Sequence, residues 1–143
     1  MQDFLKLNRL LIFFIGIGLI VLSFEVFTMH YNRIFSNVIM WIPVIFGLVG
    51  GILTLLIFLL FTRLSYYVFF LIMFVSIIVG FLGMYYHNYW RFPVFYDFFF
   101  HYKPIPFTVF TTFTPFLAPS AFIAIGGLGF LIAFFEPWGK NRG

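Results

Sequence analysis

The chain has 143 residues, of which 64% are hydrophobic and 8% are charged, and its formal net charge is +4. A soluble domain carries about 25% charged residues, so this composition excludes a water-soluble fold. The sequence contains no cysteine, which excludes disulfides, iron–sulfur clusters and thiolate-bound metals. An integral membrane protein with a single domain, residues 1–143, is therefore expected.

Four apolar stretches are long enough to cross the hydrocarbon core of a bilayer, which takes about 20 helical residues. In chain order they are residues 10–29, 38–61, 64–86 and 116–135. Helices are favoured because lipid offers no hydrogen-bond partner to the backbone. The sequence therefore predicts an all-α integral membrane protein with four transmembrane helices.

The basic residues indicate how the helices are oriented. Lys6 and Arg9 precede the first stretch as in a signal peptide, but no small-residue cleavage site follows, which favours an uncleaved anchor. The side with both termini carries five basic residues and the other side three: Lys6, Arg9, Arg63, Lys140 and Arg142 against Arg33, Arg91 and Lys103. This bias favours cytoplasmic termini. Basic residues that stand singly suit lipid head groups and argue against nucleic acid.

The connection between the third and fourth stretches, residues 87–115, is rich in aromatic residues. Pro93, Pro104 and Pro106 interrupt it, and they argue against a further spanning helix. Aromatic residues at this density belong at a membrane–water interface or against another protein. We therefore expect an interfacial cap on the outer surface.

Two parts of the chain resemble each other, which suggests a repeated helical hairpin. Residues 41–58 align with 117–134 without gaps, and six of the 18 positions are identical, including Pro43 with Pro119 and Gly51 with Gly127. The segments that precede them also correspond, with His30 opposite His87. Parallel repeats of this kind occur in transporters. Chance similarity between apolar helices is the alternative, and both interpretations stay open.

Glu25 is the one formally charged residue within the four stretches. An ionisable group inside a membrane is costly and is therefore a candidate functional residue. It lies about 6 Å below the outer end of its stretch at 1.5 Å per residue, which reduces the cost. A carboxyl group that tilts towards water or pairs with Arg33 or Arg91 is the structural alternative.

His30 and His87 are the candidate cofactor ligands. Both fall at the outer ends of their helices, and a two-fold axis relating the repeats would place them face to face. Neutral imidazole binds iron, copper and zinc, so the pair predicts a transition-metal or haem site that Glu25 and His101 could complete. Glu25 and His30 are about 140° apart around a helix, which weakens the four-ligand version. Histidines that hydrogen-bond water or head groups are the alternative.

The sequence favours helix packing over catalysis. Gly47 and Gly51 form a GxxxG pair, and Ser120 and Ala124 a second small-residue pair, which let membrane helices approach closely. No nucleophile–base set, phosphate loop or zinc-protease motif is present, and no helix carries the polar stripe of a pore.

Three functions are compatible with these features. The favoured one is a small non-catalytic accessory subunit of a larger membrane complex, respiratory, photosynthetic or similar, because the 26 phenylalanines suit docking to other subunits or to a second copy of the chain. The second is a stand-alone metal or haem protein that uses His30 and His87. The third is a homodimeric transporter with Glu25 as its ion site, which ranks last because four helices are few for a transporter.

Overall fold

The computed structural model describes residues 2–35, 37–60, 62–111 and 119–135, in which every regular element is a helix. The elements are α1 (Gln2–Ile34), the 3-10 turn η1 (Val38–Met40), α2 (Trp41–Leu60), α3 (Arg63–Asn88), the 3-10 turn η2 (Tyr89–Arg91), α4 (Phe92–His101), α5 (Thr108–Thr111) and α6 (Ser120–Phe135). The predicted all-α class is confirmed for these residues.

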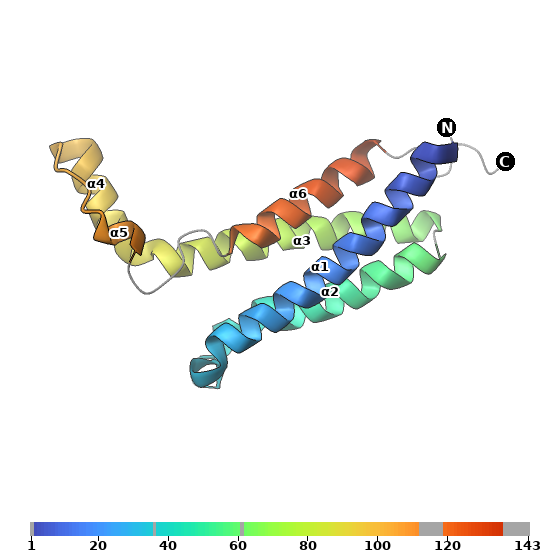
Figure 1. Ribbon diagram of the computed structural model, residues 1–143, viewed down its shortest axis with the longest axis horizontal. Coiled ribbons are helices and arrows are strands. Elements are labelled where there is room, and N and C mark those ends of the chain that lie inside the picture. Colours follow the sequence, from blue (N-terminus) through green and yellow to red (C-terminus); the bar gives the residue numbers. More distant parts are fainter. Residues whose placement is uncertain (1, 36, 61, 112–118, 136–143) are drawn as a thin grey trace.

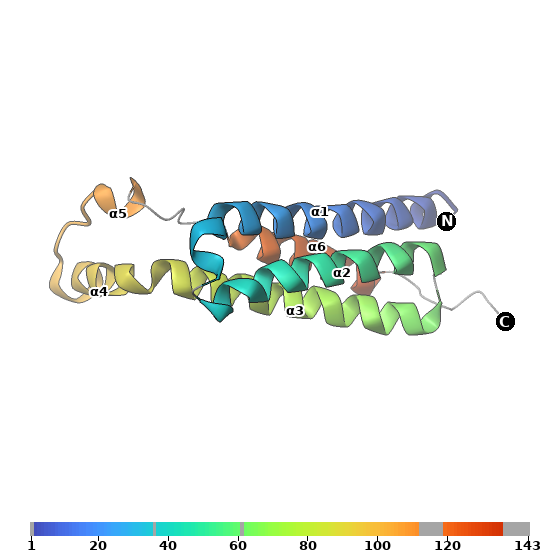
Figure 2. The ribbon, with the colours of Figure 1, turned by 90° about the horizontal axis from the view of Figure 1, so that it is seen from below.

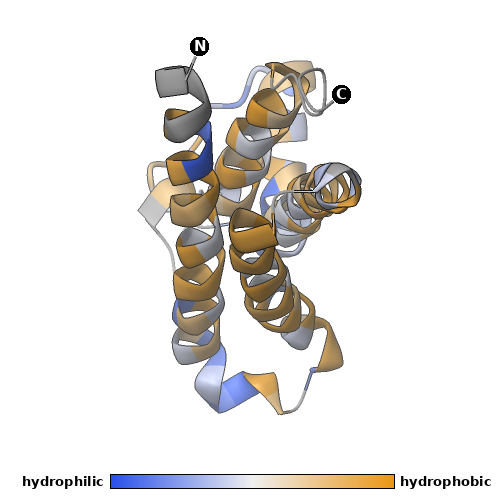
Figure 3. Ribbon diagram, turned by 90° about the vertical axis from the view of Figure 1, so that its right-hand side faces the viewer, coloured by the Kyte–Doolittle hydropathy of each residue, from blue (hydrophilic) through white to orange (hydrophobic). Residues whose placement is uncertain are grey.

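Three helical segments are long and apolar enough to cross a membrane, namely Leu7–Ile34, Val38–Leu60 and Leu64–His101. The fourth predicted stretch contains α6, which is apolar but shorter, and residues 116–118 of that stretch lie outside the described residues. Apolar residues make up most of the length of the helices (Figure 3), and large apolar side chains are exposed on α1, α2, α3 and α6 as well as buried between them. A helix that is apolar all round is typical of a membrane span.

The helices α1, α2, α3 and α6 form two closely packed antiparallel pairs. α1 packs along α2, α6 packs along α3, and contacts between α2 and α3 and between α1 and α6 are less extensive (Figures 1 and 2). A capping box produces the short turn between α2 and α3, because Thr62 and Ser65 each accept a hydrogen bond from the other's backbone N–H through their side chains.

Glycines lie where the paired helices approach most closely. A Cβ atom on Gly51 would lie 2.6 Å from Cγ1 of Ile20 and 2.8 Å from the backbone oxygen of Gly16, so α1 and α2 could not pack this closely around a larger side chain. Gly126 has the same role between α6 and α3, since its Cβ would lie 2.8 Å from the backbone oxygen of Met73. The backbones of the paired helices therefore lie close together, as small residues allow between membrane helices.

A buried serine hydroxyl adds one hydrogen bond across each pair. Ser23 donates to the carbonyl oxygen of Val44 at 2.6 Å, which joins α1 to α2. Ser76 donates to the carbonyl oxygen of Phe122 at 2.9 Å, which joins α3 to α6. The acceptor carbonyls already serve their own helices, so the serines add interhelical contacts without disturbing the helical hydrogen bonds.

Removing either hydroxyl is expected to weaken the fold modestly. Ser23→Ala and Ser76→Ala should each lower the free energy of unfolding by about 0.6 kcal/mol, the average for interhelical hydrogen bonds in a membrane. Unfolding in detergent, followed by tryptophan fluorescence, measures the change. The control is Thr28→Val, because the exposed Thr28 hydroxyl bonds only within α1, to the oxygen of Glu25. Equal losses in all three variants would contradict the interhelical role.

The aromatic segment contains two helices, and its expected place at the membrane surface stays a prediction. η2 and α4 extend beyond the end of the four-helix bundle (Figure 2), and α4 turns away from the axis of α3 (Figure 1). α5 packs against this segment, with Phe110 in contact with Phe95 of α4. Pro93 falls in the first turn of α4, where a missing N–H costs little, so it is compatible with this helix. Tyr102 ends α4 in the left-handed conformation, with φ of 53°. We call residues 89–111 the lobe.

Candidate functional site

His30 and His87 meet at the end of the bundle where α1 and α3 finish. Their ring centroids are 5.6 Å apart and the ring planes lie at 65°, an edge-to-face contact. Both side chains are half-buried. The structure thus brings the two predicted imidazoles together, and their role as ligands stays a prediction.

A backbone hydrogen bond fixes the ring of His30. Its Nδ1 atom lies 3.0 Å from the carbonyl oxygen of Val26, one turn earlier in α1. A carbonyl oxygen can only accept, so Nδ1 carries the proton in this bond. In the neutral ring the lone pair is then on Nε2, which is the state of a histidine ready to bind a metal ion.

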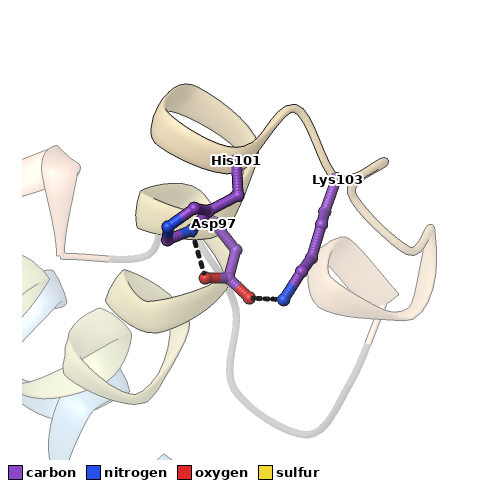
Figure 4. Close-up of polar contacts among 3 residues, drawn as sticks. All are labelled: Asp97, His101 and Lys103. Carbon is purple, nitrogen blue, oxygen red and sulfur yellow. Dashed lines mark hydrogen bonds and ion pairs between the residues drawn. The ribbon is translucent and has the colours of Figure 1, made fainter.

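Glu25 and His101 do not join the histidine pair. Glu25 is exposed on α1. His101 is in α4, where its Nδ1 atom lies 3.1 Å from Asp97 Oδ1, while Lys103 Nζ donates to Asp97 Oδ2 at 2.7 Å (Figure 4). Across the described ranges, no three His, Asp or Glu side chains form a group that could hold a metal ion. The four predicted residues therefore do not form one site in this structure.

Arg91 is the residue of this region that sequence reasoning missed. It is treated there as an interfacial charge, but its side chain is fully buried at the base of the lobe. Its Nε donates to the carbonyl oxygen of Val109 at 2.8 Å. One terminal nitrogen donates to the carbonyl oxygen of His87 at 2.9 Å and to Asn88 Oδ1 at 2.6 Å.

Arg91 therefore attaches the α5 segment to the end of α3. Its guanidinium also stacks on Trp90, with the central carbon 4.3 Å from the ring centroid. A guanidinium presents several donors in a fixed plane, so one arginine side chain can donate hydrogen bonds to several acceptors at once. A weak sequence signal existed, since Asn88 and Arg91 are three apart and share a helix face.

The lobe exposes a dense set of aromatic side chains. Tyr102 is 90% exposed, Phe107 78% and Phe99 68%. The full set of exposed aromatic residues from Phe92 onward in the lobe is Phe92, Tyr96, Phe98, Phe99, Phe100, Tyr102, Phe107 and Phe110. Exposed apolar surface on this scale marks a site of contact with protein or membrane.

The histidine pair adjoins the base of the lobe. Arg91 donates one hydrogen bond to the backbone oxygen of His87 and another to that of Val109 in α5. Any function proposed for this end of the molecule has to account for both features. Comparison of the chain with protein-family models, with curated proteins and with solved structures finds no match.

Proposed function

We propose that this chain is a small non-catalytic accessory subunit of a larger membrane protein complex, of a respiratory, photosynthetic or similar kind, and that the lobe is its docking surface. The observation that carries the proposal is the set of exposed aromatic residues on a helix that extends beyond the bundle. The partner is an integral membrane subunit with an apolar surface near the membrane boundary.

The position of the lobe supports contact with a protein. α4 lies beyond the end of the four-helix bundle and turns away from the axis of α3 (Figures 1 and 2). The 26 residues of α3 alone span about 39 Å at 1.5 Å per residue, which already covers the roughly 30 Å of the hydrocarbon core. The aromatic side chains of the lobe then lie at or beyond the membrane boundary, where another protein can cover them.

The shape of the lobe is fixed before docking. Arg91 holds α5 against the end of α3 through three hydrogen bonds. Phe95 and Phe110 contact each other across the lobe, with ring centroids 6.4 Å apart. A preorganised surface loses less conformational entropy on binding than a flexible one, which favours a stable complex.

We further propose that α6 is a fourth membrane span, which places both termini on the cytoplasmic side. It is antiparallel to α3 and ends at the same end of the bundle as the α2–α3 turn (Figure 1). Its 16 residues span about 24 Å, which is most of the roughly 30 Å of the hydrocarbon core. The distribution of basic residues supports this orientation.

Duplication of a helical hairpin is also proposed. The contact of Gly47 with Ser23 and that of Gly80 with Ile123 join positions that the sequence repeat aligns. The correspondence shifts by one residue further along, because Gly51 packs on α1 whereas its counterpart Gly127 has open space around it. Divergence of the two interfaces after duplication accounts for such a shift.

Site-specific photo-crosslinking in native membranes tests the docking role. A benzophenone amino acid at position 99 in the lobe is compared with one at position 135 at the other end of the bundle. Phe99 and Phe135 are matched, being 68% and 67% exposed. We expect position 99 to give one defined protein adduct and position 135 to react with lipid. Reaction of both positions with lipid alone would refute docking through the lobe.

A further inference from the structure

We propose that His30 and His87 bind a single transition-metal ion at the end of the bundle. The ion would be held by one imidazole nitrogen from α1 and one from α3, with water at the remaining positions. This proposal concerns a different surface from the lobe and does not depend on the accessory-subunit role.

The separation of the two rings suits one shared ion. A metal ion lies about 2.0–2.1 Å from an imidazole nitrogen, and therefore roughly 3 Å from the centre of the ring. Two rings on one ion then have centres roughly 5 Å apart at a tetrahedral angle and roughly 6 Å apart when they are opposed. The observed 5.6 Å lies between these limits, so an ion could enter after rotation of the His87 ring while the His30 ring keeps its bond to Val26.

The surroundings of the His30 ring resemble the support of a known metal ligand. A metal-binding histidine usually donates its second ring N–H to a carbonyl or carboxylate, which sets the tautomer and the ring orientation. His30 makes such a bond from Nδ1 to the carbonyl oxygen of Val26. The backbone of His87 is held by Arg91, which donates to its carbonyl oxygen at 2.9 Å.

The donor set indicates which ions can bind. Imidazole nitrogen suits copper, zinc, iron and nickel, and copper(II) binds most tightly among the divalent ions of this series. Within the part of the chain that the structure describes, no third His, Asp or Glu joins the pair, so the coordination sphere is left open to water or to an incoming group. An open copper(II) complex of two imidazoles is the expected species.

Copper(II) alone is the probe for the test. The protein is purified in detergent through a tag without histidine, stripped of metal and titrated with copper(II). We expect one ion per chain and an electron paramagnetic resonance spectrum with hyperfine coupling to two imidazole nitrogens. His30→Phe and His87→Phe keep a flat ring in place, and each should weaken binding at least tenfold. The control His101→Phe should leave binding and spectrum unchanged, because His101 is paired with Asp97 in the lobe.

Three results would overturn the proposal. The first is equal copper binding by the variant that carries both His30→Phe and His87→Phe. The second is a wild-type spectrum with coupling to fewer than two nitrogens, which decides the question even if a variant fails to fold. The third is a Soret band on addition of haem that is lost in either variant, which would make the pair a haem site.

Discussion

Gly51→Leu is expected to separate α1 from α2 and to destabilise the protein by about 3 kcal/mol or more, the upper range for overpacking. The new side chain would collide with backbone atoms, because a Cβ at this position already lies 2.8 Å from the oxygen of Gly16 and 3.1 Å from the amide nitrogen of Ile20. Backbone atoms cannot move aside without shifting the whole helix. The gain in helix propensity from glycine to leucine, at most about 1 kcal/mol, offsets only part of this cost.

Gly127→Leu is the matched control. Gly127 occupies the aligned position in the second half of the chain, and no atom lies within 4 Å of its would-be Cβ. The variant Gly127→Leu makes the same change in helix propensity without a collision between helices. Both proteins are heated in detergent and the folded fraction is measured by size-exclusion chromatography. A lower melting temperature for Gly51→Leu alone is predicted, and equal melting of the two variants would show that α1 and α2 do not pack through Gly51.

Arg91→Met should release the α5 segment from the end of α3. The variant keeps a long side chain but loses the donors to Val109, His87 and Asn88. An acceptor left buried without its donor costs about 1–3 kcal/mol, so residues 102–111 should move into water to regain hydrogen bonds. Amide hydrogen exchange in these residues is expected to rise by at least tenfold, while exchange in the centres of α1 and α2 stays unchanged.

Lys103→Met is the control for that experiment. Its side chain is 64% exposed and pairs with Asp97 on the surface, and such pairs contribute about 0–1 kcal/mol. Exchange should therefore change little in this variant. Slow exchange in residues 102–111 of Arg91→Met would contradict the role of Arg91 as the attachment point of α5.

The helical class and the apolar segments could be predicted from sequence because lipid imposes both. A backbone in hydrocarbon has to satisfy its own hydrogen bonds, and about 20 apolar residues are needed to cross. The ends of the helices could not be predicted in this way. Hydropathy marks the part of a helix that suits lipid, whereas α1 starts at Gln2 and ends at Ile34, well beyond residues 10–29.

The helices of the lobe could not be predicted from its composition, because the effect of a proline depends on its position in the helix. Pro93 would break a helix interior, but a short 3-10 turn before it makes it part of a first turn. Composition alone does not reveal that turn. The burial of Arg91 could not be predicted either, because one of its hydrogen-bond acceptors is the carbonyl oxygen of Val109, 18 residues away along the chain.

The candidate site was predicted in part. The alignment of His30 with His87 indicated that the rings would face each other, and they are in contact. The same reasoning could not exclude His101, because its place depends on the direction of α4. That helix leads away from the bundle, and His101 pairs with Asp97 instead.

Gentle detergent extraction of the protein from its native membrane, followed by sizing, tests the accessory-subunit proposal most directly. We predict that the 16.9 kDa chain migrates within a much larger assembly that contains fixed amounts of other membrane proteins. Crosslinks from position 99 should then map to one of those proteins. A chain that runs alone, stable and unaggregated, at the size of a single copy in its detergent micelle would contradict the proposal.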